Sequence, residues 1–198
     1  TGDKEFFESA ISDNKNELIV YSAITHNKKL DFTAYRIDLA QMKVAQKIKL
    51  NYKGGDIVAV SDGLINNEGD FFLPVYTQIG SRNFADEYDI LTLRRNEKLF
   101  RKTSLPIRDN YLEYPFEKMD NEHNQIHFAS FFATKKNGNN EGVTTATFDM
   151  QSLQFVFTKF FPFGEELRAE TGARRKDRAL NEFRINHLLV KNDGGFLI

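Results

Sequence analysis

The densest group of charged side chains in this sequence is a basic run toward its C-terminal end. Arg174, Arg175, Lys176 and Arg178 stand together, interrupted only by Asp177. Clustered arginines and lysines can bind phosphate groups, nucleic acids or acidic protein surfaces. Glutamates at positions 165, 166 and 170 precede the run, so a solvated charged segment is the simpler interpretation.

Three further basic residues lie in predicted loops that would share one end of the strands with this run. If consecutive strands are antiparallel, their turns alternate between two ends, and the longer loops fall on one of them. Binding usually resides in such loops on a rigid scaffold. We therefore predict a partner-binding surface, called the long-loop surface below, made of Arg82, Lys135, Lys136, Arg174, Arg175, Lys176 and Arg178.

The overall charge favours a protein as the partner of this surface. Twenty-seven basic and twenty-eight acidic residues give a net charge of -1. No general field would attract a nucleic acid or an anionic membrane. We expect a protein partner, no nucleic acid, and no membrane insertion of this segment, because the sequence contains no run of eighteen apolar residues.

Enzymatic chemistry has little support in the residue pattern. Nucleophile elbows, phosphate-binding glycine loops and His-Glu-x-x-His pairs are all absent from the sequence. Glycoside hydrolysis would need two facing carboxylates, and acidic residues are plentiful, but none is marked out as a pair. We assign no catalytic residue, and a glycan-binding or glycan-hydrolysing module remains the alternative function.

The candidate metal ligands are also better explained structurally. The four histidines, His26, His123, His127 and His187, are scattered, whereas zinc needs three or four converging ligands. Turns such as 66–70 carry several oxygen ligands but lack the spacing of a calcium-binding loop, and Asx turns account for them. With no cysteine in the chain, thiolate sites are excluded. We assign no metal and no cofactor.

All these candidates are carried by a repeating unit of about fifty-five residues. Each unit begins with a polar turn that leads into an apolar strand. Residues at matching places in these strands, called landmark residues below, are separated by 53, 55 and 70 positions: Leu18, Phe71, Ile126 and Phe196. A second series in step with the first has separations of 57 and 54: Met42, Leu99 and Leu153. Repeats of this length indicate modules that bury their cores against neighbours.

Each repeat divides into short segments rich in β-branched and aromatic residues, which are typical of strands. Nineteen phenylalanines and no tryptophan suggest an interior built from phenylalanine. The predicted strands are 6–11, 18–24, 32–38 and 44–50, then 56–60, 70–77, 88–94 and 99–105, then 112–118, 125–133, 143–149 and 154–161, and finally 183–190 and 194–198.

Four antiparallel strands per unit are typical of a β-propeller blade, so we predict an all-β fold of this type. A β-sandwich is the alternative, although it need not repeat at this interval. About three and a half blades are visible, fewer than a closed ring requires, and we expect a partial propeller within a larger ring. The predicted boundaries are 6–50, 56–105, 112–161 and 183–198, with a charged insertion at 162–182 that forms a short helix or a loop.

The C-terminal segment 180–198, with its Lys191-Asn192-Asp193-Gly194-Gly195 turn between two apolar strands, resembles propeller-like repeat proteins of Bacteroidetes bacteria. The resemblance implies export to the periplasm or cell envelope and membership of a multiprotein assembly, and it brings no catalytic residues. No secretion signal is visible in the chain. We expect a non-catalytic propeller scaffold that binds a protein through its long-loop surface.

Overall fold

The computed structural model describes residues 7–26, 28–54, 57–78, 84–113, 115–135, 138–170, 185, 187–191, 193 and 195–197. Antiparallel strands make up nearly all of its regular structure, which confirms the predicted all-β class. The chain divides into two compact units, residues 1–78 with 88–105 and residues 79–87 with 106–198. Each unit is described by itself.

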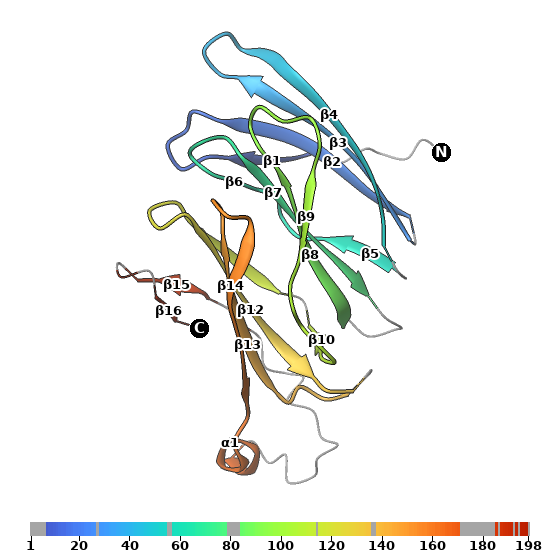
Figure 1. The fold of residues 1–198 in the computed structure, drawn as a ribbon, viewed down its shortest axis with the longest axis vertical. Coiled ribbons are helices and arrows are strands. Elements are labelled where there is room, and N and C mark those ends of the chain that lie inside the picture. The colour runs from blue at the N-terminus through green and yellow to red at the C-terminus, as the bar shows by residue number, and fades with distance from the viewer. Residues whose placement is uncertain are drawn as a thin grey trace. The chain divides into compact units, whose positions relative to one another are not determined.

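The first unit begins with a four-stranded sheet, called the first meander below. Its strands follow one another in space as they do in sequence, each antiparallel to the next (Figure 1). Alternation in β3 explains its placement, because Leu30, Phe32 and Ala34 are buried while their neighbours face outward. The strands are β1 (Glu8–Ile11), β2 (Leu18–His26), β3 (Lys29–Asp38) and β4 (Lys43–Lys53).

The second meander completes this unit. β7 pairs with β5 and β6 on one side and neighbours β8 on the other, and β8 pairs in turn with β9. The part of β8 from Tyr88 onward belongs to the first unit, and its first residues belong to the second. The strands are β5 (Ile57–Val60), β6 (Leu64–Ile65), β7 (Phe71–Gln78), β8 (Ala85–Leu93) and β9 (Arg101–Ser104).

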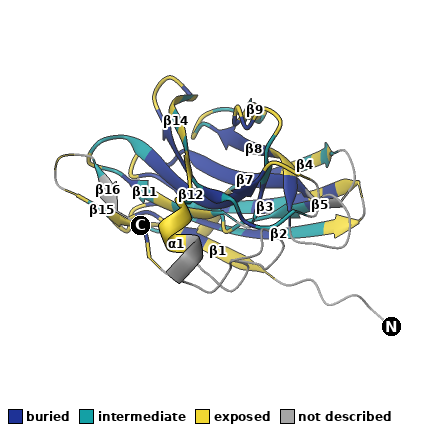
Figure 2. Ribbon diagram, turned by 90° about the horizontal axis from the view of Figure 1, so that it is seen from below, coloured by how far each residue is buried: buried dark blue, intermediate teal, exposed yellow. Residues whose placement is uncertain are grey.

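The core of the first unit lies between these two meanders. Phe71 of β7 packs against Tyr21 and Phe32 of the first meander, with ring centroids 5.6 and 5.8 Å apart. These three rings are almost fully buried, as are Ile19, Leu73 and the other members of the same apolar cluster. Figure 2 shows β7 in the dark blue of buried residues. Burial of large aromatic side chains supplies most of the stabilisation of such a core.

The second unit contains the third meander, formed by β11, β12, β13 and β14 in that order. The short strand β10 pairs with β12 and, through Leu112, with Ala85. The elements are β10 (Tyr111–Leu112), β11 (Phe116–Asp120), β12 (Gln125–Ala133), β13 (Gly142–Asp149), β14 (Gln154–Pro162), α1 (Glu165–Glu170), β15 (Leu189–Val190) and β16 (Phe196–Leu197).

The landmark residues occupy one structural position four times. Each is paired across an antiparallel hairpin with an aliphatic or methionine residue of the preceding strand: Ile11 with Leu18, Ile65 with Phe71, Met119 with Ile126, and Val190 with Phe196. The residue after the first strand also donates its N–H to the carbonyl just before the landmark residue in three hairpins. The bonds are Ser12 to Glu17 at 3.0 Å, Asn66 to Asp70 at 3.1 Å and Lys191 to Gly195 at 2.7 Å.

Two of the three residues in the second landmark series, Met42 and Leu153, occupy equivalent turns. Met42 and Leu153 have positive φ angles of 49° and 57°, immediately before β4 and β14. Both turns begin with an aspartate whose Oδ1 accepts a backbone N–H three residues later, at 2.9 Å for Asp38 and 2.6 Å for Asp149. Leu99 does not share the positive φ, because the turn from β8 to β9 is built differently.

The predicted strands differ from the observed ones at their ends and at one break. The short strand β6 is not among the predicted strands, and of the predicted strand 183–190 the described residues form a strand at Leu189–Val190. The predicted strand 112–118 is divided into β10 and β11 around Pro115, which lacks the N–H that a continuous ladder needs. The charged tract does begin with a short helix, α1, and the segment 171–184 lies outside the described residues. The described strands form open sheets and do not close into a ring.

Candidate functional site

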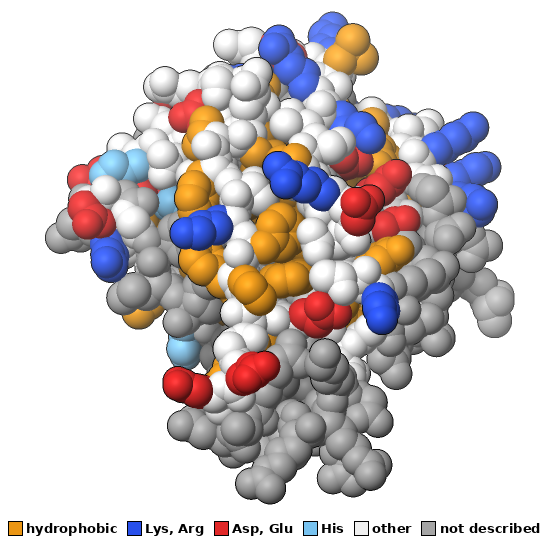
Figure 3. All heavy atoms as spheres, turned by 60° about the horizontal axis from the view of Figure 1, so that its bottom comes forward, with side chains coloured by type: hydrophobic (Ala, Val, Ile, Leu, Met, Phe, Trp, Pro, Cys, Tyr) orange, Lys and Arg blue, Asp and Glu red, His pale blue; other side chains and the backbone are white. Residues whose placement is uncertain are grey.

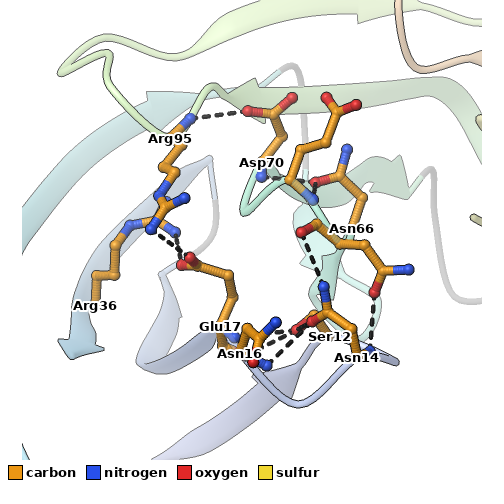
Figure 4. Close-up of polar contacts among 10 residues, drawn as sticks. Ser12, Asn14, Asn16, Glu17, Arg36, Asn66, Asp70 and Arg95 are labelled. Atoms are coloured by element: carbon orange, nitrogen blue, oxygen red, sulfur yellow. Dashed lines mark hydrogen bonds and ion pairs between the residues drawn. The ribbon is translucent and has the colours of Figure 1, made fainter. Parts of the chain in front are cut away.

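Five charged side chains meet where the first two landmark hairpins turn, and Figure 4 shows Glu17, Arg36, Asp70 and Arg95 among them. Glu17 is buried and receives a hydrogen bond from Arg36 at 2.9 Å and an ion pair from Arg95 at 2.7 Å. Asp70 forms an ion pair with Arg94 and accepts the backbone N–H of Arg95 at 2.8 Å. Arg95 therefore links the two buried carboxylates, and we call these five residues the turn cluster.

Hydrogen-bonded turns hold the carboxylates of the turn cluster in place. Asn66 Oδ1 accepts the backbone N–H groups of Glu68 at 3.1 Å and Asp70 at 2.8 Å, which is the predicted Asx turn. Asn14 bonds across to Asn67 through its backbone N–H at 2.9 Å and its side-chain amide at 3.2 Å. The two turns are thus fastened to each other as well as to their own strands.

Gly69 shows how tightly the turn cluster is packed. Its φ of +88° is a conformation that L side chains rarely adopt, and a Cβ at this position would lie 2.9 Å from Glu17 Cδ. Because Glu17 is itself fixed by Arg36, this carbon could not be accommodated without moving the ion pair. The turn therefore requires glycine for two separate reasons.

A third buried carboxylate of the first unit, Asp89, also has several partners. Asp89 accepts hydrogen bonds from Tyr52 and Ser104, each at 2.6 Å, and Lys102 Nζ lies 3.1 Å from it. Its side chain is 3% exposed, so its charge is balanced inside the protein rather than by solvent. These contacts occupy both carboxylate oxygens of Asp89.

The buried carboxylate of the second unit has histidines as neighbours. Asp120 Oδ2 lies 2.7 Å from His123 Nδ1 and 3.8 Å from His127 Nε2. Burial raises the pKa of Asp120, but the backbone N–H, ring and charge of His123 outweigh it, and the pKa lies below its usual value. Burial lowers the pKa of His127, only partly opposed by Asp120, so its imidazole is held neutral beside Thr147.

These contacts give the buried carboxylates structural roles. Glycoside hydrolysis needs one protonated and one ionised carboxyl group facing a shared space. Glu17, Asp70, Asp89 and Asp120 instead each bind a cationic or histidine side chain. Within the described residues, no group of three or more histidine and acidic side chains is arranged to hold a metal ion.

The structure places one residue of the predicted long-loop surface. Lys135 is exposed in the loop that follows β12. The other predicted residues lie outside the described part of the chain, so the long-loop surface stays a prediction. They are Arg82, Lys136, Arg174, Arg175, Lys176 and Arg178.

A different exposed surface is not anticipated by the sequence argument, which places phenylalanines in the core. β14 exposes Val156 by 59%, Phe157 by 43% and Phe161 by 44% of their surface. Exposed apolar patches often mark interaction sites, and Figure 3 shows hydrophobic side chains reaching the surface between polar and charged ones. The signal that could have revealed them is the strand itself, whose residues 155–157 and 160–161 are apolar on both faces.

Comparison with known proteins does not identify a family for this chain. No protein-family model matches the chain, and no characterised protein is similar to it in sequence. The structure defines an all-β protein of repeated antiparallel meanders. None of the helices in the described residues is long and apolar enough to cross a membrane.

Proposed function

We propose that this chain is a non-catalytic scaffold, a partial β-propeller whose blades are the meanders, and that it binds a protein partner. The observation that carries the proposal is the recurrence of one landmark hairpin in all three meanders and again at β15 and β16. Stacked copies of one unit are the construction of repeat scaffolds, which present a broad surface to other proteins. The paired, buried carboxylates support a structural use of charge.

The proposed setting is the periplasm or cell envelope, within a multiprotein assembly. This part of the proposal is supported by the resemblance of segment 180–198 to exported repeat proteins. Separation of the native cells into cytoplasmic, periplasmic and membrane fractions, followed by immunodetection, tests it. Recovery of the protein in the cytoplasmic fraction would contradict this location.

Chemical cross-linking in the native cells tests the scaffold function. We expect a single reproducible partner linked to Lys135, the exposed member of the long-loop surface. Lys135→Glu should weaken capture of that partner, while Lys49→Glu on the first meander serves as the matched charge reversal and should not. Equal capture by both variants would contradict the assignment of this surface.

The glycan alternative is tested separately with purified chain. Calorimetric titration with neutral and acidic oligosaccharides should give no heat of binding, and incubation should release no reducing ends. Hydrolysis that is lost on substitution of a buried carboxylate such as Asp89 would overturn the non-catalytic proposal.

A further inference from the structure

β4 is the last strand of the first meander, and one of its two long edges has no partner strand in the described part of the chain (Figure 1). Its pairing with β3 runs from Lys43 to Lys53 on the other edge. In an antiparallel sheet, alternate residues of an edge strand direct their N–H and C=O groups away from the neighbouring strand. β4 is 11 residues long, so it offers an extended backbone edge to which another strand can pair.

One face of β4 carries a row of lysines along this edge. Lys47, Lys49 and Lys53 are exposed and alternate along the strand, with Asn51 at the remaining position of the same face. Alternate residues of a strand are about 6.7 Å apart, so the three side chains follow one another at regular intervals. No acidic residue occurs in the segment 39–55. We call Lys47, Lys49 and Lys53 the lysine row.

The first meander does little to balance these charges. Lys53 is paired directly across the sheet with Lys29, and like charges in this position destabilise a sheet. Asp31 lies on the same face, but its partner across the sheet is the one position of the row that is not a lysine. The Nζ of Lys47 lies 5.3 Å from the centroid of the Tyr35 ring, which orients the ammonium group and leaves its charge in place. Among the described residues, no acidic side chain forms an ion pair with the lysine row.

The other face of β4 leaves apolar surface at the same edge. Ile48 is buried in the core of the first unit, whereas Leu50 and Tyr52 pack against that core but are only partly buried. A strand added beside β4 would place every second side chain next to these residues. Such a strand therefore needs apolar side chains on one face and acidic side chains on the other.

The lysine row also selects among the possible occupants of this edge. A second copy of β4 would place lysines beside lysines, which is how natural sheets prevent association edge to edge. A strand with carboxylates at alternate positions brings opposite charges together instead, with Cβ atoms about 5 Å apart. A nucleic acid would neutralise the lysines but would leave the backbone edge and the apolar surface of Leu50 unused. The combined features favour an acidic polypeptide strand.

We propose that the free edge of β4 binds an extended segment of a protein partner in which acidic and apolar residues alternate. The segment joins the first meander as a fifth strand, with its carboxylates beside Lys47, Lys49 and Lys53. Strand addition obtains affinity from main-chain hydrogen bonds and selectivity from alternate side chains. Lys135 of the long-loop surface belongs to the other unit, so this inference goes beyond the proposed function and names a second docking surface.

Peptide binding to the 198-residue chain tests the proposal. The probe is a fluorescently labelled peptide of alternating glutamate and valine, as long as β4, and fluorescence anisotropy measures its Kd. We expect saturable binding that weakens as salt is added. Lys49→Glu should weaken it by about fivefold, because one attractive cross-strand pair becomes repulsive. Lys98→Glu, at an exposed position between β8 and β9, is the matched charge reversal and should bind the peptide as the wild type does. Lys53→Glu provides a second variant, which also removes the like-charge pair with Lys29.

A peptide of the same sequence that is N-methylated throughout separates strand pairing from simple charge attraction. It keeps every carboxylate but has no backbone N–H to donate, so we expect it not to bind. Equal binding of the two peptides, or tighter binding of a single-stranded DNA oligonucleotide, would overturn strand addition and indicate a general polyanion surface. Equal affinities for Lys49→Glu and Lys98→Glu would overturn the role of the lysine row. Lys49→Glu should retain partner capture through Lys135, so failure of this inference is distinguishable from failure of the proposed function.

Discussion

β4 and β14 occupy the same place in their meanders, but their surroundings differ. Both follow a turn in which an aspartate caps the backbone and a residue with positive φ precedes the strand. The face of β4 that carries Ile48 is covered by the second meander, whereas β14 exposes the rings of Phe157 and Phe161. On its other face β4 carries lysines at 47, 49 and 53, a common protection of edge strands against pairing. Equivalent backbone geometry is thus compatible with very different side chains.

The first and third meanders also carry different side chains at equivalent buried positions. Ile19 and Arg36 are paired neighbours in the first meander, and His127 and Thr147 are paired neighbours in the third. Arg36 joins the turn cluster, which requires acidic partners from neighbouring turns. The repeat therefore preserves the hairpins, while the packing partner of each meander determines its side chains.

The largest effect that distinguishes the meanders should come from Arg36→Ala. Removing this guanidinium leaves Glu17 buried with only the exposed Arg95 as a cationic partner, and loss of one member of a buried ion pair costs about 3 kcal/mol. Thr147→Ala, at the equivalent place, should cost about 1 kcal/mol, since a neutral hydrogen bond is lost. Urea unfolding monitored by circular dichroism measures both.

The matched control for this experiment is Arg95→Ala, whose side chain is 55% exposed. It should cost about 0.5 kcal/mol, because exposed ion pairs contribute little. If Arg36→Ala and Arg95→Ala destabilise the chain equally, the burial of the turn cluster does not govern its contribution.

The next prediction compares β4, which is covered by the second meander, with β14, which is more exposed. Ile48→Ala should destabilise the chain by about 2.5 kcal/mol, because it leaves a cavity between the two meanders. Lys159→Ala at the matching position of β14 should change stability by about 0.5 kcal/mol or less. Thermal and urea unfolding measure the loss of stability in both variants. Similar losses would contradict the comparison.

The repeated hairpins could be predicted from sequence because their determinants are local. Asn66 and Asp38 bind backbone groups within four residues, so the residue type and the turn are directly connected. The alternation of Leu30, Phe32 and Ala34 likewise marks a strand with one covered face. These features define where strands begin and end.

The turn cluster could not be predicted because its members are distant in sequence. Glu17 meets Arg36 across a strand pair and Arg95 across two meanders, which depends on register and packing. The exposure of Phe157 and Phe161 on β14 is equally a matter of packing, since the sequence of the strand shows two apolar faces without showing what packs on them. Local patterns specify the hairpins, and long-range packing specifies which charges and rings are buried.

A smaller difference between the meanders should appear as pH dependence. His127 has a lowered pKa in the folded chain, so below the unfolded value of about 6.5 the unfolded state binds more protons. Stability should therefore fall as the pH decreases from 7 through 6.5 toward the folded pKa. The lowered pKa of Asp120 acts in a separate window, with stability lost only below its usual value near 3.9.

His127→Gln should remove the decrease near pH 6 while preserving a neutral hydrogen-bonding side chain. His26→Gln, an exposed histidine of the first meander, is the matched control and should retain it. Unfolding free energies measured at half-unit intervals from pH 7.5 to 5 test the assignment. Identical pH profiles for the wild type and His127→Gln would show that burial of this imidazole contributes nothing to the pH dependence.

The two turns with positive φ provide a last comparison, in which Met42→Gly should have one of the smallest effects. Met42 is 78% exposed, so Met42→Gly should relieve backbone strain at little packing cost and stabilise the chain by about 0.5 kcal/mol. Leu153 has nearly the same φ but is only 8% exposed, and Leu153→Gly should destabilise by about 2 kcal/mol as buried surface is lost. Opposite signs from one backbone geometry would show that side-chain burial, and not the turn itself, sets the outcome. If both variants changed stability in the same direction by similar amounts, backbone conformation would instead dominate at these turns.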